Sequence, residues 1–181
     1  MNGFADALRG SLAVMLLACA SAPAARPHPE GGTDLRVPLV RQAPERCGQA
    51  ALEMVMGYYG ADAGSLHEAD RAYDPALRGS LITDLAAAAR RAGFDAEVAT
   101  LTPDSLIGLL AAGVPPVVLY QNGRRPLTVP HFGVVTGWDP ARGVFTLNDG
   151  RDRPRVVRRD DLARRWRTAG SQALIGRRRA P

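Results

Sequence analysis

The chain has 181 residues, of which 46% are hydrophobic and 23% are charged, a balance that suits a globular protein with one well-buried core. This composition excludes collagen-like, coiled-coil and wholly disordered chains. Two cysteines and three histidines are too few for a disulfide scaffold or a four-cysteine zinc site. We therefore expect neither a metal nor a cofactor.

The net charge of +5 comes from arginine alone and is concentrated at the end of the chain. Eleven arginines and three aspartates lie between Arg151 and Pro181, whereas acidic residues outnumber arginines before this stretch. An arginine-rich end could contact nucleic acid or anionic phospholipid. Because no nucleic-acid motif or interleaved aromatic residue accompanies it, we expect a solvated or membrane-facing surface and no nucleic-acid partner.

The first residues have the pattern of a targeting segment. An apolar run over Ser11–Ala18 follows Arg9 and is too short to span a bilayer, but it is long enough for the core of a signal peptide. The run ends in L-L-A-C at 16–19, which resembles a bacterial lipobox. The resemblance implies cleavage before Cys19 and lipidation of that residue, so that acyl chains hold the protein at a membrane. The alternative is a plain secretory signal that is cut a few residues later.

Either signal places the domain outside the cytoplasm. We divide the chain into a lipoprotein signal peptide at 1–18, a lipidated Cys19 with a flexible Ala-, Pro- and Gly-rich tether at 19–34, and one domain at 35–181. Ala20 is compatible with sorting to the outer membrane. We therefore expect a lipoprotein anchored in the cell envelope at the periplasmic face.

Helical patterns dominate the first half of the domain. After an extended piece at Leu35–Val40, apolar residues recur at helical spacing over Cys47–Tyr59 and stop at Gly60. Further helices are predicted over Ser80–Ala92 and Thr102–Ala112, the latter opening with a threonine N-cap and a proline.

The second half has the pattern of an antiparallel sheet. Runs of β-branched and aromatic residues predict strands at Val114–Tyr120, Phe132–Trp138 and Gly143–Asn148, the last two joined by an Asp-Pro turn. A short helix at Asp160–Trp166 and a final strand at Gln172–Gly176 follow. Helices first and a sheet second indicate an α+β fold.

Four residues could together carry nucleophilic catalysis. Cys47 lies where a helix is expected to begin, and the free N–H groups and dipole of a helix start lower a thiol pKa. His131 could accept the thiol proton, and Asp149, at the end of the next strand, could orient the imidazole. The amide of Gln42 could hold a developing oxyanion beside the backbone N–H at the helix start. Each residue also has a plain structural explanation, so only the combination favours catalysis.

Two stretches of the chain carry a family resemblance. The first runs from V-P-L-V-R-Q through C-G-Q-A-A-L to G-Y-Y-G over residues 37–60. The second is H-F-G-V-V-T-G-W-D at 131–139, followed by N-D at 148–149. Over residues 35–176 the chain resembles the bacteriocin-processing (double-glycine leader) cysteine peptidase family, whose fold is papain-like. The resemblance implies Cys47 as nucleophile, His131 as general base and acid, Asp149 as the orienting group and Gln42 as oxyanion-hole donor.

The chain departs from the family pattern at three positions. Arg46 replaces an acidic residue before the cysteine, Gln49 replaces a proline after Cys-Gly, and Gly150 replaces a proline after the aspartate. The last departure leaves open whether Asn148 or Asp149 faces the histidine, because adjacent strand residues point to opposite faces.

The sequence therefore predicts a cysteine peptidase that hydrolyses a peptide or protein substrate. A preference for small residues such as Gly-Gly at the cleavage site follows from the resemblance alone. With no P-loop and no room for membrane spans, we expect a free-standing lipoprotein relative without transporter domains. Two alternatives stay open: a transpeptidase or amidase of envelope peptides, and a catalytically inactive lipoprotein that binds peptides. The sequence does not specify an oligomeric state.

Overall fold

The computed structural model describes residues 26–27, 31–124 and 126–179. Within them eight strands form one sheet in the order β1-β2-β5-β4-β8-β3, and β6 pairs with β5 and β7 beside this path. The strands are β1 (Arg26–Pro27), β2 (Thr33–Asp34), β3 (Phe94–Thr100), β4 (Val117–Arg124), β5 (Leu127–Asp139), β6 (Val144–Asn148), β7 (Arg155–Arg158) and β8 (Gln172–Arg178). The helices are α1 (Cys47–Tyr58), α2 (Ala63–His67), the 3-10 helix η1 (Glu68–Ala72), α3 (Ile82–Arg91), α4 (Pro103–Ala111) and α5 (Arg159–Arg167).

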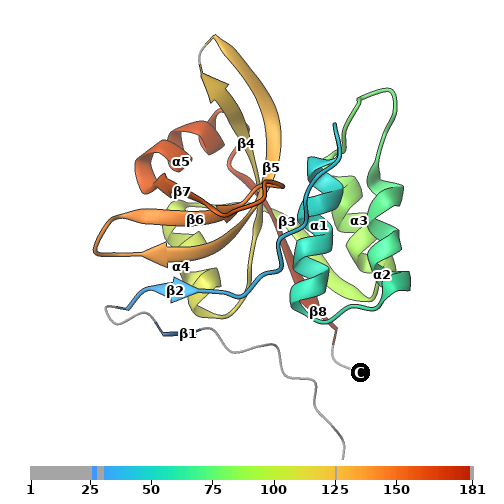
Figure 1. Ribbon diagram of the computed structural model, residues 1–181, viewed down its shortest axis with the longest axis horizontal. Coiled ribbons are helices and arrows are strands. Elements are labelled where there is room, and N and C mark those ends of the chain that lie inside the picture. The colour runs from blue at the N-terminus through green and yellow to red at the C-terminus, as the bar shows by residue number, and fades with distance from the viewer. Residues whose placement is uncertain (1–25, 28–30, 125, 180–181) are drawn as a thin grey trace, which may run out of the picture.

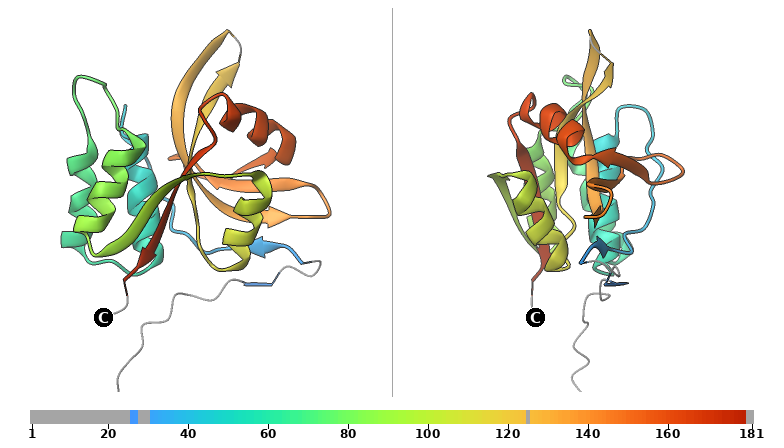
Figure 2. Two further views of the ribbon diagram at one scale, coloured as in Figure 1. Left: turned by 180° about the vertical axis from the view of Figure 1, so that it is seen from behind. Right: turned by 90° about the vertical axis from the view of Figure 1, so that its left-hand side faces the viewer.

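These elements separate into two halves, which Figure 1 and Figure 2 show side by side. The helical half consists of α1, α2, η1 and α3, which pack on one another. The sheet half consists of β4 to β7 with α4 and α5 packed against them. β8 and β3 extend the sheet to α3, and α1 packs on β5, so the two halves share one hydrophobic core.

α1 begins at Cys47, as the sequence predicts, and it is buried along most of its length. Its apolar stripe, with Leu52 and Val55 at its centre, packs between β5 and the helices α3 and η1. Gly60 follows the helix with φ +71°, a left-handed conformation that glycine adopts without steric cost and that ends the helix. The helix thus presents its N-terminal residue at the boundary between the two halves.

The other predicted helices form within one or two residues of their expected bounds. In α4 the Thr102 hydroxyl accepts a hydrogen bond from the Ser105 N–H at 3.2 Å, and Pro103 occupies the first turn. α5 buries Trp166, whose indole N–H donates to the carbonyl of Gln172 at 2.7 Å. That contact joins α5 to the start of the last strand.

The hairpin of β4 and β5 is longer than the sequence predicts. The two strands pair from Val117 out to Arg124, which lies opposite Leu127, and they form an arm that projects from the sheet (Figure 1). Pro130 lies within this arm, where a proline would usually break a strand. In β5, Val135 and every second residue before it direct their backbone N–H groups toward β4. Pro130 lies between two of these residues and so does not belong to the series. The N–H that proline lacks would therefore point away from β4.

The sequence pattern does not predict β3 or β7. β3 pairs only with β8, and its exposed positions carry charged residues such as Asp95 and Glu97. β7 has four residues and an arginine at each end, and it pairs only with β6. Both are edge strands, in which charges on the exposed side hide the apolar alternation.

The predicted signal peptide and Cys19 lie outside the described residues. The chain joins the sheet through β2, whose Thr33 lies opposite Trp138 of β5, just before the predicted domain start at residue 35. None of the helices in the described part of the chain is long and apolar enough to cross a membrane.

Candidate active site

The N-terminus of α1 places Cys47 against the sheet half. The imidazole of His131 and the backbone N–H groups of Phe132 and Gly48 face its sulfur and act on it as hydrogen-bonding groups that lower the thiol pKa, although burial raises it. These donors and the positive end of the helix dipole stabilise a thiolate. The structure therefore brings together the two residues that the sequence predicts as nucleophile and base.

The position of His131 is set by the pairing of β5 with β4. It lies opposite Tyr120, whose ring meets the imidazole edge-on with the centroids 5.7 Å apart. The Nε2 atom of His131 is 3.1 Å from the main-chain oxygen of Asp149. Because a carbonyl oxygen can only accept, Nε2 carries a proton, and Nδ1 is left for the sulfur. The neutral imidazole is thereby held in the tautomer that can accept the proton of Cys47.

Burial and hydrogen bonding act in opposite directions on this pair. Burial raises the pKa of Cys47 and lowers the pKa of His131, because it disfavours both charged forms. Burial is the largest single influence on each pKa, but the other interactions outweigh it in sum: the contact between the two side chains, the backbone donors at the sulfur, and Asp149 at the imidazole. The pKa of Cys47 therefore falls below its ordinary 9.0, and that of His131 rises above 6.5. Both shifts favour a thiolate beside an imidazolium.

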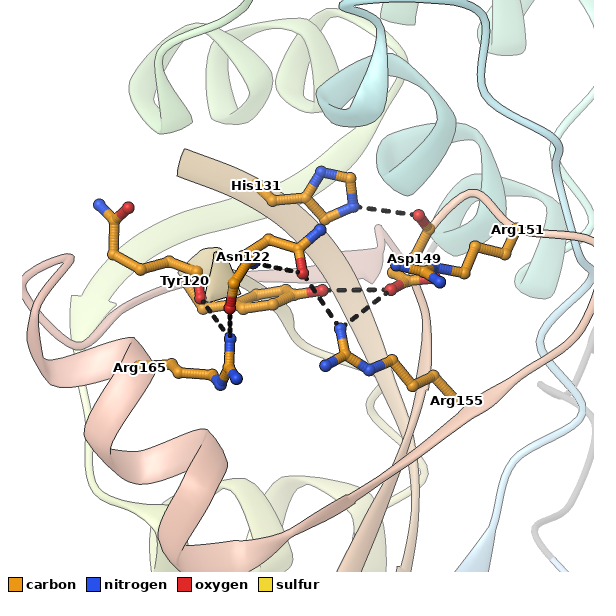
Figure 3. A network of polar contacts seen from close by, with 9 residues as sticks. Tyr120, Asn122, His131, Asp149, Arg151, Arg155 and Arg165 are labelled. Atoms are coloured by element: carbon orange, nitrogen blue, oxygen red, sulfur yellow. Dashed lines mark hydrogen bonds and ion pairs between the residues drawn. The ribbon is translucent and has the colours of Figure 1, made fainter. Parts of the chain in front are cut away.

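Asp149 reaches His131 through its main-chain carbonyl, whereas its carboxylate is bonded to other groups (Figure 3). The hydroxyl of Tyr120 donates to Oδ2 of Asp149 at 3.2 Å, and Arg155 lies 3.6 Å from the same oxygen. Nε of Arg151 is 3.3 Å from Oδ1. The structure thus places the predicted residue beside the imidazole, with its main chain as the hydrogen-bonding group.

Asn148 faces away from the Cys47–His131 pair. Its Nδ2 donates to the carbonyl of Val37 at 3.2 Å, on the side of the extended segment that precedes α1. The charge of Asp149, in contrast, helps to raise the pKa of His131. Of the two residues that the sequence leaves open, Asp149 is therefore the one on the side of the histidine.

Gln42 packs on the turn that follows β6. Its N–H donates to the carbonyl of Gly150 at 3.1 Å, and its side chain covers the same glycine. A Cβ added to Gly150 would lie 2.4 Å from Oε1 of Gln42, and the φ of +79° at this position also excludes proline. The departure from the family pattern at residue 150 thus makes room for Gln42. The glutamine is held beside the loop that carries Asp149.

A cluster that the sequence does not predict holds the loop before the nucleophile. Glu45 has φ +66°, and its carboxylate accepts hydrogen bonds from Tyr73 at 3.0 Å and from Nε of Arg78 at 2.7 Å. Arg46 lies over the Tyr73 ring, 4.4 Å from its centroid, and pairs with Asp70 at 3.3 Å. A residue other than glycine keeps a positive φ where contacts of this kind hold the backbone in place. The partners are distant in sequence, so no local pattern could have revealed them.

Gln49, the second unusual residue beside the nucleophile, is buried and ties α1 to the segment before α3. Its Nε2 donates to Oγ of Ser80 at 2.8 Å. Gly48 allows this close approach, because a Cβ there would lie 3.1 Å from the same oxygen. The glutamine thus supplies a polar anchor for the helix start where the family pattern has a proline.

Two cavities lie near these elements. One of about 210 Å³ lies beside the start of α1 and is lined by residues that include Gln42, Arg46 and Glu53. Another of about 500 Å³ lies between the β4–β5 arm and α5, lined by residues that include Gln121 and Arg165. Among the described residues no group of three or more His, Cys, Asp or Glu side chains could hold a metal ion.

Comparison with known proteins agrees with this architecture. Residues 34–174 match the Peptidase_C39 like family. The peptidase domain of Streptococcus ComA, a bi-functional ABC transporter of a quorum sensing pathway, superposes with a TM-score of 0.63 at 19% identity, over 78% of this chain and 98% of that one. No curated protein matches the sequence significantly.

Two further solved structures have the same fold. A double glycine motif protease from an AMS/PCAT transporter, in complex with the leader peptide, gives a TM-score of 0.61 at 23% identity, over 81% of this chain and 94% of that one. A C39-like peptidase from Bacillus anthracis gives a TM-score of 0.63 at 18% identity, over 81% of this chain and 96% of that one. These likenesses confirm the predicted α+β, papain-like peptidase fold. With the match over most of its length, the chain belongs to the Peptidase_C39 like family.

Proposed function

We propose that this protein is a cysteine peptidase with Cys47 as nucleophile and His131 as general base and acid. The observation that carries the proposal is the contact of the thiol with the imidazole, which lowers the pKa of Cys47 and raises that of His131. A cysteine kept only for packing would have its pKa raised by burial. A thiolate beside an imidazolium is the activated form of a nucleophilic cysteine.

The reaction follows from these positions as acyl transfer in two steps. The Cys47 thiolate attacks the substrate carbonyl, and the amide of Gln42 and the Cys47 backbone N–H hold the oxyanion. The imidazolium of His131 gives its Nδ1 proton to the departing amine, and a thioester remains. The neutral imidazole then takes a proton from water, whose oxygen attacks the thioester and releases the acid and the thiolate. The carbonyl of Asp149 keeps the ring oriented throughout.

The substrate class rests on the fold relatives. One of them is a double glycine motif protease that was solved with the leader peptide. We infer that this chain likewise takes an extended peptide and cleaves after small residues such as Gly-Gly. A peptide backbone can approach a half-buried thiol closely when no side chain intervenes.

The proposed location is the cell envelope, with Cys19 lipidated as its lipobox-like sequence suggests. β1 and β2, through which the chain enters the sheet, lie at the far end of the protein from the N-terminus of α1 (Figure 1). A lipid anchor before β1 would therefore leave the Cys47–His131 pair facing away from the membrane. This arrangement supports a peptide substrate that arrives from the aqueous side.

The test uses the full chain carrying Cys19→Ser, in which Cys47 is the remaining thiol. Purified protein is incubated with peptides that contain a Gly-Gly junction, and products are identified by mass spectrometry. We expect cleavage after the second glycine, loss of cleavage in Cys47→Ala, and a thioester intermediate that hydroxylamine traps.

Two other outcomes would replace the proposal. Transfer of the acyl group to a labelled amine, with little hydrolysis, would identify a transpeptidase. Peptide binding that survives Cys47→Ala, with a thiol that alkylates like free cysteine, would identify an inactive binding protein.

A further inference from the structure

The carboxylate of Asp149 is fully buried, yet its partners are residues that the catalytic step does not use. The Tyr120 hydroxyl donates to Oδ2 at 3.2 Å, Arg155 lies 3.6 Å from Oδ2, and Arg151 lies 3.3 Å from Oδ1 (Figure 3). Oδ1 has no hydrogen-bond partner of suitable geometry among the described residues. An acidic group in this position is expensive to bury unless it is paired.

The residues that hold this carboxylate are fixed by contacts of their own. Arg155 of β7 also donates to Oδ1 of Asn122 in the β4–β5 arm at 3.2 Å. Tyr120 of β4 is buried and meets the His131 ring edge-on, at an angle of 85° between the two planes. Burial and the Asp149 charge raise the pKa of Tyr120, so its hydroxyl stays protonated and donates. One carboxylate, in the loop after β6, therefore connects this loop to β4 and β7 beside the imidazole.

We propose that Tyr120 and Arg155 are positioning residues that restrain the Asp149 carboxylate, so that the main-chain carbonyl of Asp149 receives the imidazole N–H. The proposal rests on the proposed function, in which His131 is the catalytic base. Asp149 then acts through two separate groups: its carbonyl orients His131, and its carboxylate is held by Tyr120 and Arg155.

The restraint has a chemical consequence for His131. A carboxylate forms a stronger hydrogen bond with an imidazolium than a carbonyl does, and it would hold the imidazole proton more tightly. A hydroxyl and two guanidinium groups hold the Asp149 carboxylate, so its charge acts on His131 through space and not through a hydrogen bond. The base therefore returns its proton to the leaving amine more readily. The titratable or charged groups that face His131 and Asp149 are Cys47 of α1, Tyr120 of β4, Arg151 of the loop after β6 and Arg155 of β7.

The test is a titration of His131 in the full chain carrying Cys19→Ser, followed by NMR of labelled histidine and by the rate of Cys47 alkylation against pH. The variants are Arg155→Gln and Tyr120→Phe, with Arg155→Lys as the conservative replacement. Freeing the carboxylate should raise the His131 titration midpoint by roughly 0.5 to 1 pH unit. Arg155→Lys should restore most of the wild-type midpoint.

Two controls separate positioning from a general effect of charge or stability. Arg142→Gln removes an exposed arginine that pairs with Asp139, and it should leave the His131 midpoint unchanged. His67, which is 79% exposed, serves as an internal reference in every spectrum. Tyr120→Phe removes one oxygen atom and no charge, so it remains informative if the arginine variants fold poorly.

The decisive comparison repeats Arg155→Gln in an Asp149→Asn background. If Arg155 acts through the carboxylate, its effect on the His131 midpoint should largely vanish there. An undiminished effect would mean that Arg155 acts on His131 by its own charge, and no shift in either single variant would mean that the network is only structural. Either result overturns the proposal. Because the titration needs no substrate, it stands apart from any failure to cleave peptides.

Discussion

The two sides of the candidate active site are built in different ways. On the helical side, Cys47 lies at the first residue of α1, and the N–H of the next residue, Gly48, stabilises its sulfur. On the sheet side, His131 receives its partners from β4 and from the loop after β6, which are brought together only by strand pairing. The place of Cys47 at a helix start is thus encoded locally, whereas its contacts with His131 and Phe132, and the orientation of the imidazole, depend on long-range register.

Removal of the imidazole gives the largest expected effect, because it breaks the contact between the two halves. His131→Ala should lower the rate of peptide cleavage by about 10²- to 10⁴-fold, the usual contribution of a general acid and base. The pKa of Cys47 should also rise toward its ordinary 9.0, since burial then acts with less opposition. Cleavage assays and alkylation against pH measure the two effects.

His67→Ala is the matched control, because this side chain is 79% exposed and pairs with Asp70 on the surface. It should leave both measurements unchanged. Equal loss of activity in the two variants would argue against His131 as the base.

The turn at Gly150 is the point where the helical side depends on the sheet side. Gly150→Ala should destabilise the protein by about 2–4 kcal/mol, because it combines a left-handed φ with a Cβ placed 2.4 Å from Oε1 of Gln42. Gly143→Ala is the matched control, because Gly143 also has a left-handed φ, +61°, but a Cβ there would meet nothing within 4 Å. We expect this variant to lose about 1–2 kcal/mol of stability. Urea unfolding compares the two variants directly. Equal losses would show that contact with Gln42 contributes nothing.

The same contrast explains what could be predicted from the sequence. The start of α1 at Cys47 and the Thr102 cap both follow from local patterns. The length of the β4–β5 arm does not follow from local patterns. Pro130 fits inside a strand only in the observed register, in which the N–H that proline lacks would point away from β4. The contact of His131 with a carbonyl also escapes sequence analysis, since it depends on what Tyr120 and Arg155 do with the Asp149 carboxylate.

Asn148 offers a smaller test of the two faces of β6. Asn148→Ala removes the hydrogen bond to the carbonyl of Val37 and leaves that oxygen buried, so a loss of about 1–2 kcal/mol in stability is expected. Because the side chain points away from the imidazole, the His131 titration midpoint should not move. A shift in that midpoint, measured by NMR, would place Asn148 in the catalytic arrangement after all.

The smallest expected effect concerns the pH at which Cys47 becomes reactive. This pH compares most directly the interactions that raise and lower the pKa of the thiol. Burial is the largest single influence and raises the pKa of the thiol, whereas His131, two backbone donors and the imidazolium charge lower it. Because their sum outweighs burial, half-maximal alkylation of the folded Cys19→Ser chain should fall below pH 9.0 and move up to that value in urea. The pair is partly buried, so added salt should change the midpoint little. A folded midpoint at or above the unfolded one would mean that burial prevails, and the thiol would then be a packing residue.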